Sequence, residues 1–129
     1  MRINHVSIWT RKLEEMRDFY VQVFNGKASD RYMNPRTGFE SYFIRFDEET
    51  TLELMRVSSI RDLIRNPERP FAGLAHIAFS VGSRTRVDQM TELLEECGYS
   101  VTSQPKVTGD GFYESCILDP DGNLVEITE

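Results

Sequence analysis

The two halves of the sequence repeat one another, and this duplication constrains the fold more than any other feature. With an offset of 71 residues, residues 4–8 (NHVSI) align with residues 75–79 (AHIAF). With an offset of 73 residues, residues 52–54 (LEL) align with residues 125–127 (VEI). The alignments superimpose the only two histidines of the chain and two glutamates flanked by aliphatic residues, namely His5 on His76 and Glu53 on Glu126. The repeat predicts two copies of one supersecondary unit.

Hydrophobic periodicity predicts the same two units. Residues 2–9 and 74–82 are rich in Ile, Val and Phe, which is typical of strands. Each segment is followed by apolar residues three and four positions apart, which predict one helix that stops at Gly26 and another that stops at Gly98. These apolar residues are Leu13, Met16, Phe19, Tyr20 and Val23 in the first helix, and Val87, Met90, Leu93 and Leu94 in the second. With the later strands, each half is predicted to be a β-α-β-β-β module.

Length and element order predict a single domain of the α+β class. A chain of 129 residues is long enough for one core and short for two ordinary domains. We expect residues 1–129 to form one domain from two modules, residues 1–57 and 74–129. Residues 58–73, which contain two prolines, are the expected linker, and residues 60–65 within it fit a short helix.

Charge and composition restrict the partners of the protein. The net charge of −6 argues against nucleic acid and anionic membranes, because both would require a basic surface. No apolar run approaches the roughly 20 residues that cross a bilayer, and the start lacks the apolar stretch of a signal peptide, so we expect a cytoplasmic location. Cys97 and Cys116 lie in apolar-looking segments, which favours reduced, buried thiols. A small-molecule substrate is the partner that we expect.

The repeated histidines and glutamates predict a metal site. Side chains alternate between the faces of a strand, so Val6 and Ile8 are expected to pack under a helix and His5 to lie on the opposite face. A glutamate inside an apolar strand needs a compensating charge, because an unpaired buried carboxylate is costly. Two related halves would bring each histidine near the glutamate of its own half, so that four ligands converge. Imidazole with carboxylate suits Zn, Ni, Co, Fe or Mn better than Ca or Mg.

Plainer interpretations stay open for single members of this set. One histidine on a strand is more often a structural residue than a ligand. One glutamate in a strand is usually solvent-facing at an edge or paired with arginine, and Arg45 and Arg56 are candidate partners for Glu53. The matching positions of both histidines and both glutamates favour the metal site.

Longer motifs resemble a known family. They are residues 4–6 (NHV), residues 19–20 (FY) before residues 24–26 (FNG), residues 75–79 (AHIAF) and residues 118–127 (LDPDGNLVEI). Over essentially the whole chain, the sequence resembles the vicinal oxygen chelate superfamily, which includes glyoxalase I, fosfomycin-resistance proteins, methylmalonyl-CoA epimerase, extradiol dioxygenases and bleomycin-binding proteins. The resemblance implies a glyoxalase-type fold, in which two β-α-β-β-β modules form a curved, cup-like mixed sheet around a metal, and it implies a homodimer.

Among these relatives, glyoxalase I has the most similar ligand set. The resemblance implies one divalent ion (Ni, Zn, Co, Fe or Mn) held by His5, Glu53, His76 and Glu126. It implies a metal-dependent lyase or isomerase, similar to lactoylglutathione lyase, that stabilises an enediolate-like intermediate on the cation. Glu126 is the expected catalytic base and Glu53 the second candidate. Bacterial glyoxalase I enzymes carry an Arg and an Asn for glutathione where this chain has Trp9 and Val57, so a different thiol or chelating substrate is expected.

The remaining pocket candidates rest on the same resemblance. We expect Trp9, Phe43, Glu114 and Cys116 to contact substrate, with Cys116 aligned on Phe43 by the repeat. The structural alternatives are that Phe43 and Cys116 belong to the core and that Glu114 faces solvent. Two other functions are open, a non-catalytic protein of the same fold that binds a drug or another small molecule, and an iron-dependent extradiol-type dioxygenase.

Overall fold

A computed structural model describes residues 3–47, 50–61 and 72–129 of the chain. These residues fall into two compact units, residues 1–64 and residues 65–129, which we call the first and the second unit. The boundary between them lies inside the predicted linker. That the two units together form one domain stays a prediction.

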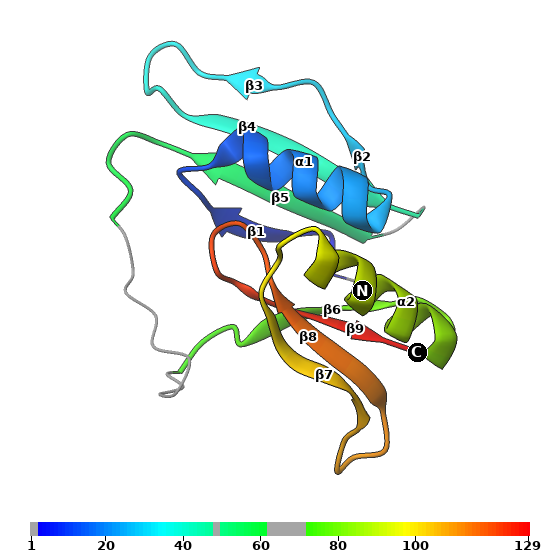
Figure 1. The fold of residues 1–129 in the computed structure, drawn as a ribbon. Helices are drawn as coiled ribbons and strands as arrows, with labels where there is room; N and C mark the ends of the chain where they lie inside the picture. The colour runs from blue at the N-terminus through cyan, green and yellow to red at the C-terminus, as the bar shows by residue number, and fades with distance from the viewer. Residues whose placement is uncertain (1–2, 48–49, 62–71) are drawn as a thin grey trace. The chain divides into compact units, whose positions relative to one another are not determined.

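In the first unit, one helix covers a five-stranded sheet (Figure 1). The sheet order is β1-β5-β4-β2, and β3 also pairs with β4. Strand β1 runs parallel to β5, and the other pairings are antiparallel. The elements are β1 (Val6–Trp9), α1 (Leu13–Phe24), β2 (Lys27–Ala28), β3 (Tyr32–Met33), β4 (Glu40–Phe46) and β5 (Thr50–Arg56).

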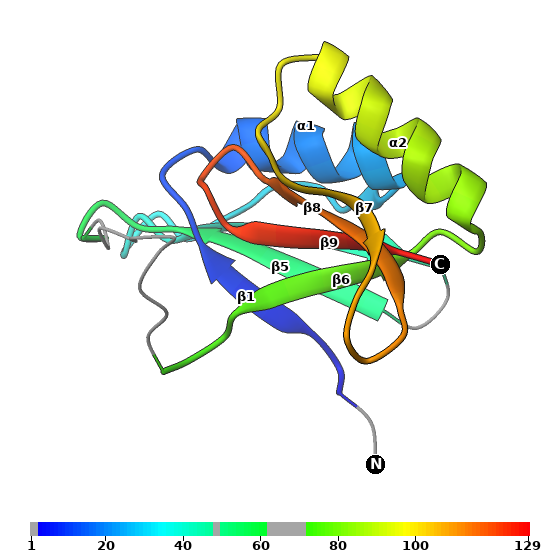
Figure 2. The ribbon, with the colours of Figure 1, turned by 60° about the horizontal axis from the view of Figure 1, so that its bottom comes forward.

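The second unit repeats this plan with four strands in the order β6-β9-β8-β7. Strand β6 is parallel to β9, and the two lie side by side in Figure 2, while the remaining pairs are antiparallel. The elements are β6 (His76–Ser80), α2 (Arg84–Glu96), β7 (Val101–Val107), β8 (Tyr113–Leu118) and β9 (Leu124–Thr128). The predicted α+β class with two β-α-β-β-β modules is thereby confirmed, with the strand after α1 divided into the short β2 and β3.

Helix α1 packs on β4 and β5 and buries the apolar residues that predicted it, except for Val23, which is half-buried. The buried side chains are Leu13, Met16, Phe19 and Tyr20. The helix ends at Asn25, whose φ of +54° is left-handed, one residue before the predicted stop at Gly26. Gly26 has a different role, because its backbone packs against Ile44 and Phe46 so closely that a side chain would not fit.

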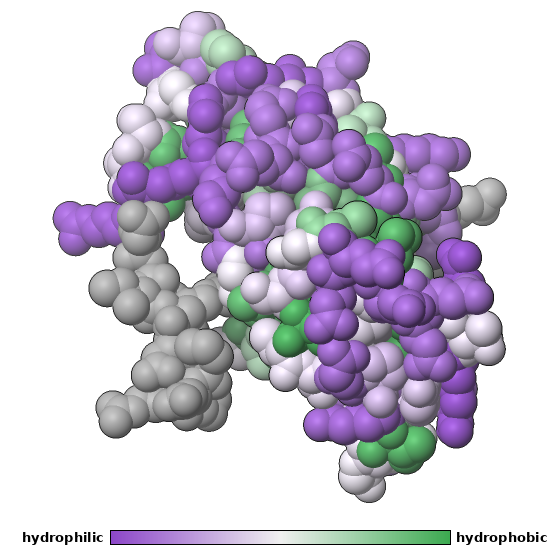
Figure 3. Space-filling view, viewed as in Figure 1, coloured by the Kyte–Doolittle hydropathy of each residue, from purple (hydrophilic) through white to green (hydrophobic). Residues whose placement is uncertain are grey.

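Helix α2 begins at Ser83, whose side chain accepts a hydrogen bond from the Arg86 backbone N–H. Its buried residues are Val87, Thr91 and Leu94. Leu93, one of the apolar residues whose spacing predicted this helix, is 58% exposed, whereas Thr91 is buried. Apolar spacing alone did not identify Thr91, since a threonine is polar. The outer face of the helix is mainly hydrophilic (Figure 3).

Two further sequence-based expectations concern the short linker helix and membrane-spanning segments. The short helix predicted over residues 60–65 lies, apart from its first two positions, outside the described residues. Among the residues that the structure describes, neither helix is long and apolar enough to cross a membrane.

Candidate functional site

Each sheet has one face beneath its helix and one face that points away from it, which we call the distal face. Strand alternation places Leu52 and Leu54 under α1, where both are buried, and Glu53 on the distal face. In β9, Val125 and Ile127 are likewise buried and flank the half-buried Glu126. The distal residues at these positions are His5, Ser7, Phe43 and Glu53 in the first unit, and His76, Ala78, Glu114, Cys116 and Glu126 in the second.

In the first unit, His5 lies close to Glu53, as the sequence predicted. The His5 Nε2 to Glu53 Oε2 distance is 3.6 Å. Ser7 is the parallel partner of Glu53, and its hydroxyl donates a hydrogen bond of 2.9 Å to the same Oε2 atom. On its other side, His5 Nδ1 lies 2.8 Å from Asn4 Oδ1. The pair is therefore held by two supporting side chains that sequence analysis did not assign to the site.

Phe43 also belongs to this group, because it is the antiparallel partner of Glu53. Its ring meets the His5 ring edge to face, with the centroids 5.7 Å apart and the planes at 88°. Phe43 is 40% exposed, so the alternative that it is a core residue is wrong. A substrate-binding role for Phe43 stays a prediction.

In the second unit, His76 and Glu126 form the equivalent pair. The distance between His76 Nε2 and Glu126 Oε2 is 3.1 Å. Burial raises the pKa of the Glu126 carboxyl, the charge of His76 lowers it, and the carboxylates of Glu114 and Asp110 raise it further. A carboxylate with a raised pKa is a stronger base than an ordinary glutamate.

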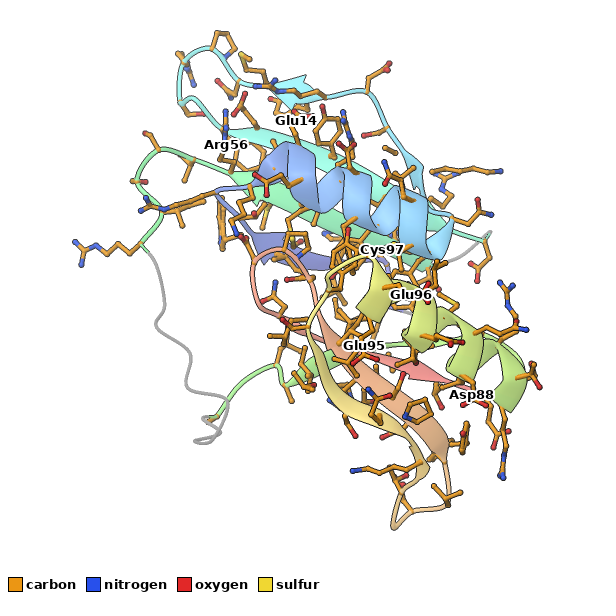
Figure 4. The ribbon with its side chains drawn as sticks, in the orientation of Figure 1. Glu14, Arg56, Asp88, Glu95, Glu96 and Cys97 are labelled. Atoms are coloured by element: carbon orange, nitrogen blue, oxygen red, sulfur yellow. The ribbon has the colours of Figure 1, made fainter. Side chains whose placement is uncertain are left out.

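Cys116 lies opposite Glu126 in the β8–β9 ladder, at the position that Phe43 holds in the first unit. Burial and the nearby carboxylates of Glu126 and Glu114 raise the pKa of its thiol to about 11. Both cysteines are free thiols, as predicted. The expectation that both are buried is wrong for Cys97, which is exposed. Cys97 lies at the end of α2, on the side of the helix that faces solvent (Figure 4).

The alternative that Arg56 neutralises Glu53 is wrong, because Arg56 pairs with Glu40 instead. Glu40 is buried on the sheet face that carries α1, and it also forms an ion pair with Arg31. The Arg31 hydrogen bond, followed by that of Arg56, lowers the pKa of the Glu40 carboxyl. Arg31 Nη1 in turn lies 3.6 Å from Oε1 of Glu14, at the start of α1. Glu14 and Arg56 are labelled in Figure 4.

Each His–Glu pair has the donor chemistry and the spacing of metal ligands. Donor atoms about 2.0–2.2 Å from one ion, at angles between a right angle and the tetrahedral value, lie roughly 2.8–3.6 Å apart. The pair distances of 3.6 Å and 3.1 Å fall in that range. Within residues 3–47, 50–61 and 72–129, no group of three His, Cys, Asp or Glu side chains is arranged to hold an ion. Each unit thus contains one His–Glu pair.

Trp9 lies at the end of β1 and is 52% exposed. Its ring contacts Phe39 edge to face, with the centroids 6.1 Å apart. Trp9 lines an open pocket of about 240 Å³ together with Val57, Ser59, Ile60 and Arg61. The two positions at which this sequence departs from bacterial glyoxalase I, Trp9 and Val57, therefore line one pocket of the first unit.

Comparison with known proteins agrees with this architecture. Residues 2–127 match the family model described as glyoxalase/bleomycin resistance protein/dioxygenase superfamily. The chain is 29% identical over 130 residues to the protein YqjT of Bacillus subtilis, covering 97% of this chain and 96% of YqjT. It is 29% identical over 133 residues to the mitochondrial methylmalonyl-CoA epimerase of Dictyostelium discoideum, covering 99% of this chain and 78% of that protein.

A solved structure shows the same fold. The trypanothione-dependent glyoxalase I of Leishmania major matches with a TM-score of 0.80 and 19% identity, over 100% of this chain and 86% of that one. At this identity the likeness establishes the glyoxalase fold.

Proposed function

The chain belongs to the glyoxalase/bleomycin resistance protein/dioxygenase superfamily, and from this premise we propose that it is a metal-dependent lyase or isomerase of the glyoxalase I type. The observation that carries the proposal is the duplicated His–Glu pair, found at equivalent register in both sheets with distances of 3.6 Å and 3.1 Å. A single His–Glu pair could be explained as an ordinary structural contact between two strands. Two pairs on the distal faces of two repeated sheets are better explained by a shared chemical role.

The proposed ligands are His5, Glu53, His76 and Glu126, which together hold one divalent ion such as Ni, Zn, Co, Fe or Mn. Two imidazoles and two carboxylates suit these metals better than Ca or Mg. When bound, the ion supplies Lewis-acid polarisation of substrate oxygens and stabilises negative charge that develops on them. A small-molecule substrate with two adjacent oxygens fits such a site.

In this proposal Glu126 moves the proton, with Glu53 as the second candidate. For a hemithioacetal, the Glu126 carboxylate removes the proton from the carbon that carries the hydroxyl group and the sulfur. It then delivers that proton to the adjacent carbonyl carbon, and the hydroxyl proton passes to the former carbonyl oxygen. The product is a 2-hydroxyacyl thioester with the same atoms as the substrate.

We propose a thiol other than glutathione for this reaction. Trp9 and Val57 replace the Arg and Asn that bind glutathione in bacterial glyoxalase I. The two side chains line one pocket with Ile60 and Arg61, so this surface offers apolar contact area and one cation. Such a lining favours a thiol with an apolar or aromatic part next to an anionic group.

A second candidate is an epimerase that acts on an acyl thioester, and the Dictyostelium relative favours it. Epimerisation also begins with removal of a proton from the carbon next to a carbonyl group. It would use the same base and the same proposed ligands, so the two candidates differ in substrate and not in the site.

The deciding experiment measures metal content and turnover in one protein. Apo protein is reloaded with Ni²⁺, Co²⁺, Zn²⁺ or Mn²⁺, and elemental analysis is expected to give about one ion per chain, the stoichiometry of one four-ligand site. Loaded protein is then assayed with hemithioacetals of several thiols and, by proton exchange in D₂O, with acyl-CoA thioesters. Glu126→Gln is expected to lose turnover, whereas Glu96→Gln, an equal charge change on the exposed end of α2, is expected to keep it.

The other outcomes separate the alternatives. Wild-type protein that binds none of these ions would overturn the proposal and leave a ligand-binding protein without turnover. Oxygen consumption with a catechol, and none of the isomerase activities, would identify a dioxygenase instead.

Assembly and location are also proposals. We expect a homodimer, because the family resemblance implies one, and light scattering of the purified protein should then give twice the mass of the chain. A monomer at micromolar concentration would contradict this expectation. A cytoplasmic location is expected as well, and fractionation of cells that express the tagged chain would test it.

A further inference from the structure

Beyond the His–Glu pairs, the distal faces of the two sheets differ in chemistry. Two positions after Glu53 in β5 lies Met55, whose parallel partner in β1 is Trp9. The equivalent pair of the second unit is Thr128 in β9 and Ser80 in β6. The first unit therefore carries an aromatic and an aliphatic side chain where its repeat carries two hydroxyl groups.

Trp9 leaves apolar surface exposed to water that the serine of the repeat does not. Its side chain is 52% exposed, although it lines a pocket. The indole meets Phe39 at 87°, and the Phe39 ring lies 6.1 Å from the Tyr32 ring, centroid to centroid. Within residues 3–47, 50–61 and 72–129, no aromatic ring stacks face to face on the indole. Trp9 is thus braced by Phe39 and keeps surface on which another ring can pack.

The pocket beside Trp9 has a wall of hydrogen-bonded backbone. The Ile60 N–H donates a hydrogen bond of 3.3 Å to the Val57 carbonyl oxygen. The guanidinium of Arg11, two residues beyond Trp9, donates a hydrogen bond to the Ile60 carbonyl oxygen. These contacts tie residues 57–60 to the end of β1. A wall that is already in place needs little ordering when a ligand binds.

The volume of the pocket limits what it can hold. The pocket measures about 240 Å³. A cavity of roughly 150 Å³ holds a benzene molecule, whereas sites for whole drug-sized ligands begin at about 300 Å³. The pocket therefore has room for one ring with a small substituent, and it is too small for the whole of a larger ligand.

The pocket also lies at a defined distance from the first His–Glu pair. Trp9 is level with Met55, two positions from Glu53, and Val57 is four positions from Glu53. At about 3.3 Å per strand residue, these offsets correspond to roughly 7 Å and 13 Å along the sheet. A ring in the pocket is therefore separated from a group at Glu53 by a spacer of several atoms.

Resting on the proposed function, we infer that the substrate carries an aromatic ring on such a spacer and that Trp9 is the residue that selects this ring. A flat ring gains attraction between aromatic edges and faces that an aliphatic group does not. Phe39 is a positioning residue that keeps the indole in place. The substrate class is thus an adduct or thioester of an arylalkyl thiol, which differs from glutathione in having a ring at the end remote from the reaction.

The first test uses Trp9 as its own reporter, because it is the only tryptophan of the chain. Apo protein is titrated with phenylpropionate and with cyclohexylpropionate, which has the same charge and a similar size but no aromatic ring. Phenylpropionate is expected to shift the Trp9 emission and to bind roughly 3–10-fold more tightly than cyclohexylpropionate. This measurement needs neither metal nor turnover.

Variants are compared by saturation-transfer NMR of phenylpropionate, since substitution of Trp9 removes the fluorophore. Trp9→Ser, which installs the residue of the second unit, is expected to weaken binding roughly 10-fold. Trp9→Phe keeps a ring and is expected to keep most of the affinity. Tyr32→Ala is the matched control, because it removes an equally exposed ring that does not line the pocket, and it is expected to bind like wild type.

Turnover tests the spacer. Metal-loaded protein is assayed with the methylglyoxal hemithioacetals of thiophenol and of phenylbutanethiol. Trp9→Ser is expected to raise KM for the phenylbutanethiol adduct roughly 10-fold with little change in kcat. It is expected to leave KM for the thiophenol adduct unchanged, because a ring directly on the sulfur does not reach the pocket.

The outcomes separate this inference from the proposed function. Ring binding to apo protein without turnover of any substrate would overturn the proposed function and leave the ring pocket. Turnover with equal binding of the phenyl and cyclohexyl compounds, and an unchanged KM in Trp9→Ser, would overturn the inference alone. A mass by light scattering that falls in both Trp9→Ser and Tyr32→Ala would identify the exposed rings as an interface between two copies of the chain, and it would also overturn the inference.

Discussion

The hydroxyl oxygens of Thr91 and Ser115 lie 2.6 Å apart in the buried layer between α2 and β8. The Thr91 hydroxyl donates its hydrogen to the Val87 carbonyl oxygen. The Ser115 hydroxyl is therefore the donor in its contact with the Thr91 oxygen. Ser115 is fully buried and Thr91 nearly so. A polar contact therefore sits inside the core of the second unit and fixes how the helix rests on its sheet.

We expect Ser115→Ala to destabilise the protein by about 1–2 kcal/mol, because it removes a hydrogen bond from a buried site. Urea unfolding followed by circular dichroism measures the change. Ser80→Ala, which removes an exposed hydroxyl at the end of β6, should leave the free energy of unfolding within about 0.5 kcal/mol of wild type. Equal effects of the two substitutions would show that the buried contact contributes nothing to stability.

A side chain at Gly26 should be poorly tolerated. A Cβ atom there would lie 2.5 Å from Ile44 Cγ2 and 2.8 Å from Phe46 Cε1. Gly26→Ala is therefore expected to cost about 1–3 kcal/mol, as overpacking in a core does. Gly109→Ala is the matched control, since a Cβ atom there meets nothing within 4 Å. The prediction fails when thermal denaturation gives the two variants the same melting temperature.

The Glu40 ion pairs should make stability depend on pH. Hydrogen bonds from Arg31 and Arg56 lower the pKa of Glu40 in the folded protein. A lowered folded pKa means that this stabilisation is fully present above the ordinary glutamate pKa of about 4.3 and is lost as the pH falls through the folded value. Wild type should exceed Glu40→Gln in free energy of unfolding at pH 7, and the difference should shrink below about pH 4. A difference that does not change between pH 7 and pH 3 would contradict this account.

The two cysteines should differ in reactivity. Cys97 is exposed, whereas burial and two carboxylates raise the pKa of the Cys116 thiol to about 11. Because the thiolate is the reactive form, iodoacetamide at pH 8 should alkylate Cys97 first and Cys116 at least about 10-fold more slowly. Mass spectrometry of apo Cys97→Ser and apo Cys116→Ser measures the two rates separately. Similar rates in these variants would show that Cys116 is not shielded.

The two site glutamates should respond differently to substitution. With saturating metal and an active substrate, Glu126→Gln is expected to lower kcat about 10²–10⁴-fold, the usual contribution of a general base. Glu53→Gln is expected to reduce metal affinity first, because Glu53 is proposed as a ligand and its carboxylate accepts a hydrogen bond from Ser7. Steady-state kinetics at several metal concentrations separates the two effects. A larger loss of kcat in Glu53→Gln at saturating metal would reverse the assignment of the base.

The repeat in the sequence predicted the ladder positions of the site. An offset of 73 residues aligned Glu53 with Glu126, and the structure pairs these glutamates with Phe43 and Cys116, which the same offset aligns. This success has a physical reason. In a strand with one face in the core, a shift of one residue would bury the glutamate and expose the aliphatic residues, so the apolar pattern determines the register.

The sequence was less informative where polar groups lie in unexpected places. Thr91 is buried although apolar spacing did not select it, because its hydroxyl finds partners inside the unit. Arg56 was a candidate partner for Glu53, yet it binds Glu40 from the neighbouring strand. Such contacts depend on which side chains two strands bring together, and a single sequence carries little information about them.

The parallel pairing of β1 with β5 and of β6 with β9 has a consequence for how the protein folds. Ser7 and Glu53 are 46 positions apart in the chain, and they meet only when the first and the last strand of their unit are side by side. Contacts between such distant positions close late, because a long loop must be ordered before they form. Neither His–Glu pair can assemble in a partly synthesised module. Capture of an ion by the four proposed ligands would therefore report that both modules have folded, and it would add its binding free energy to the native state alone.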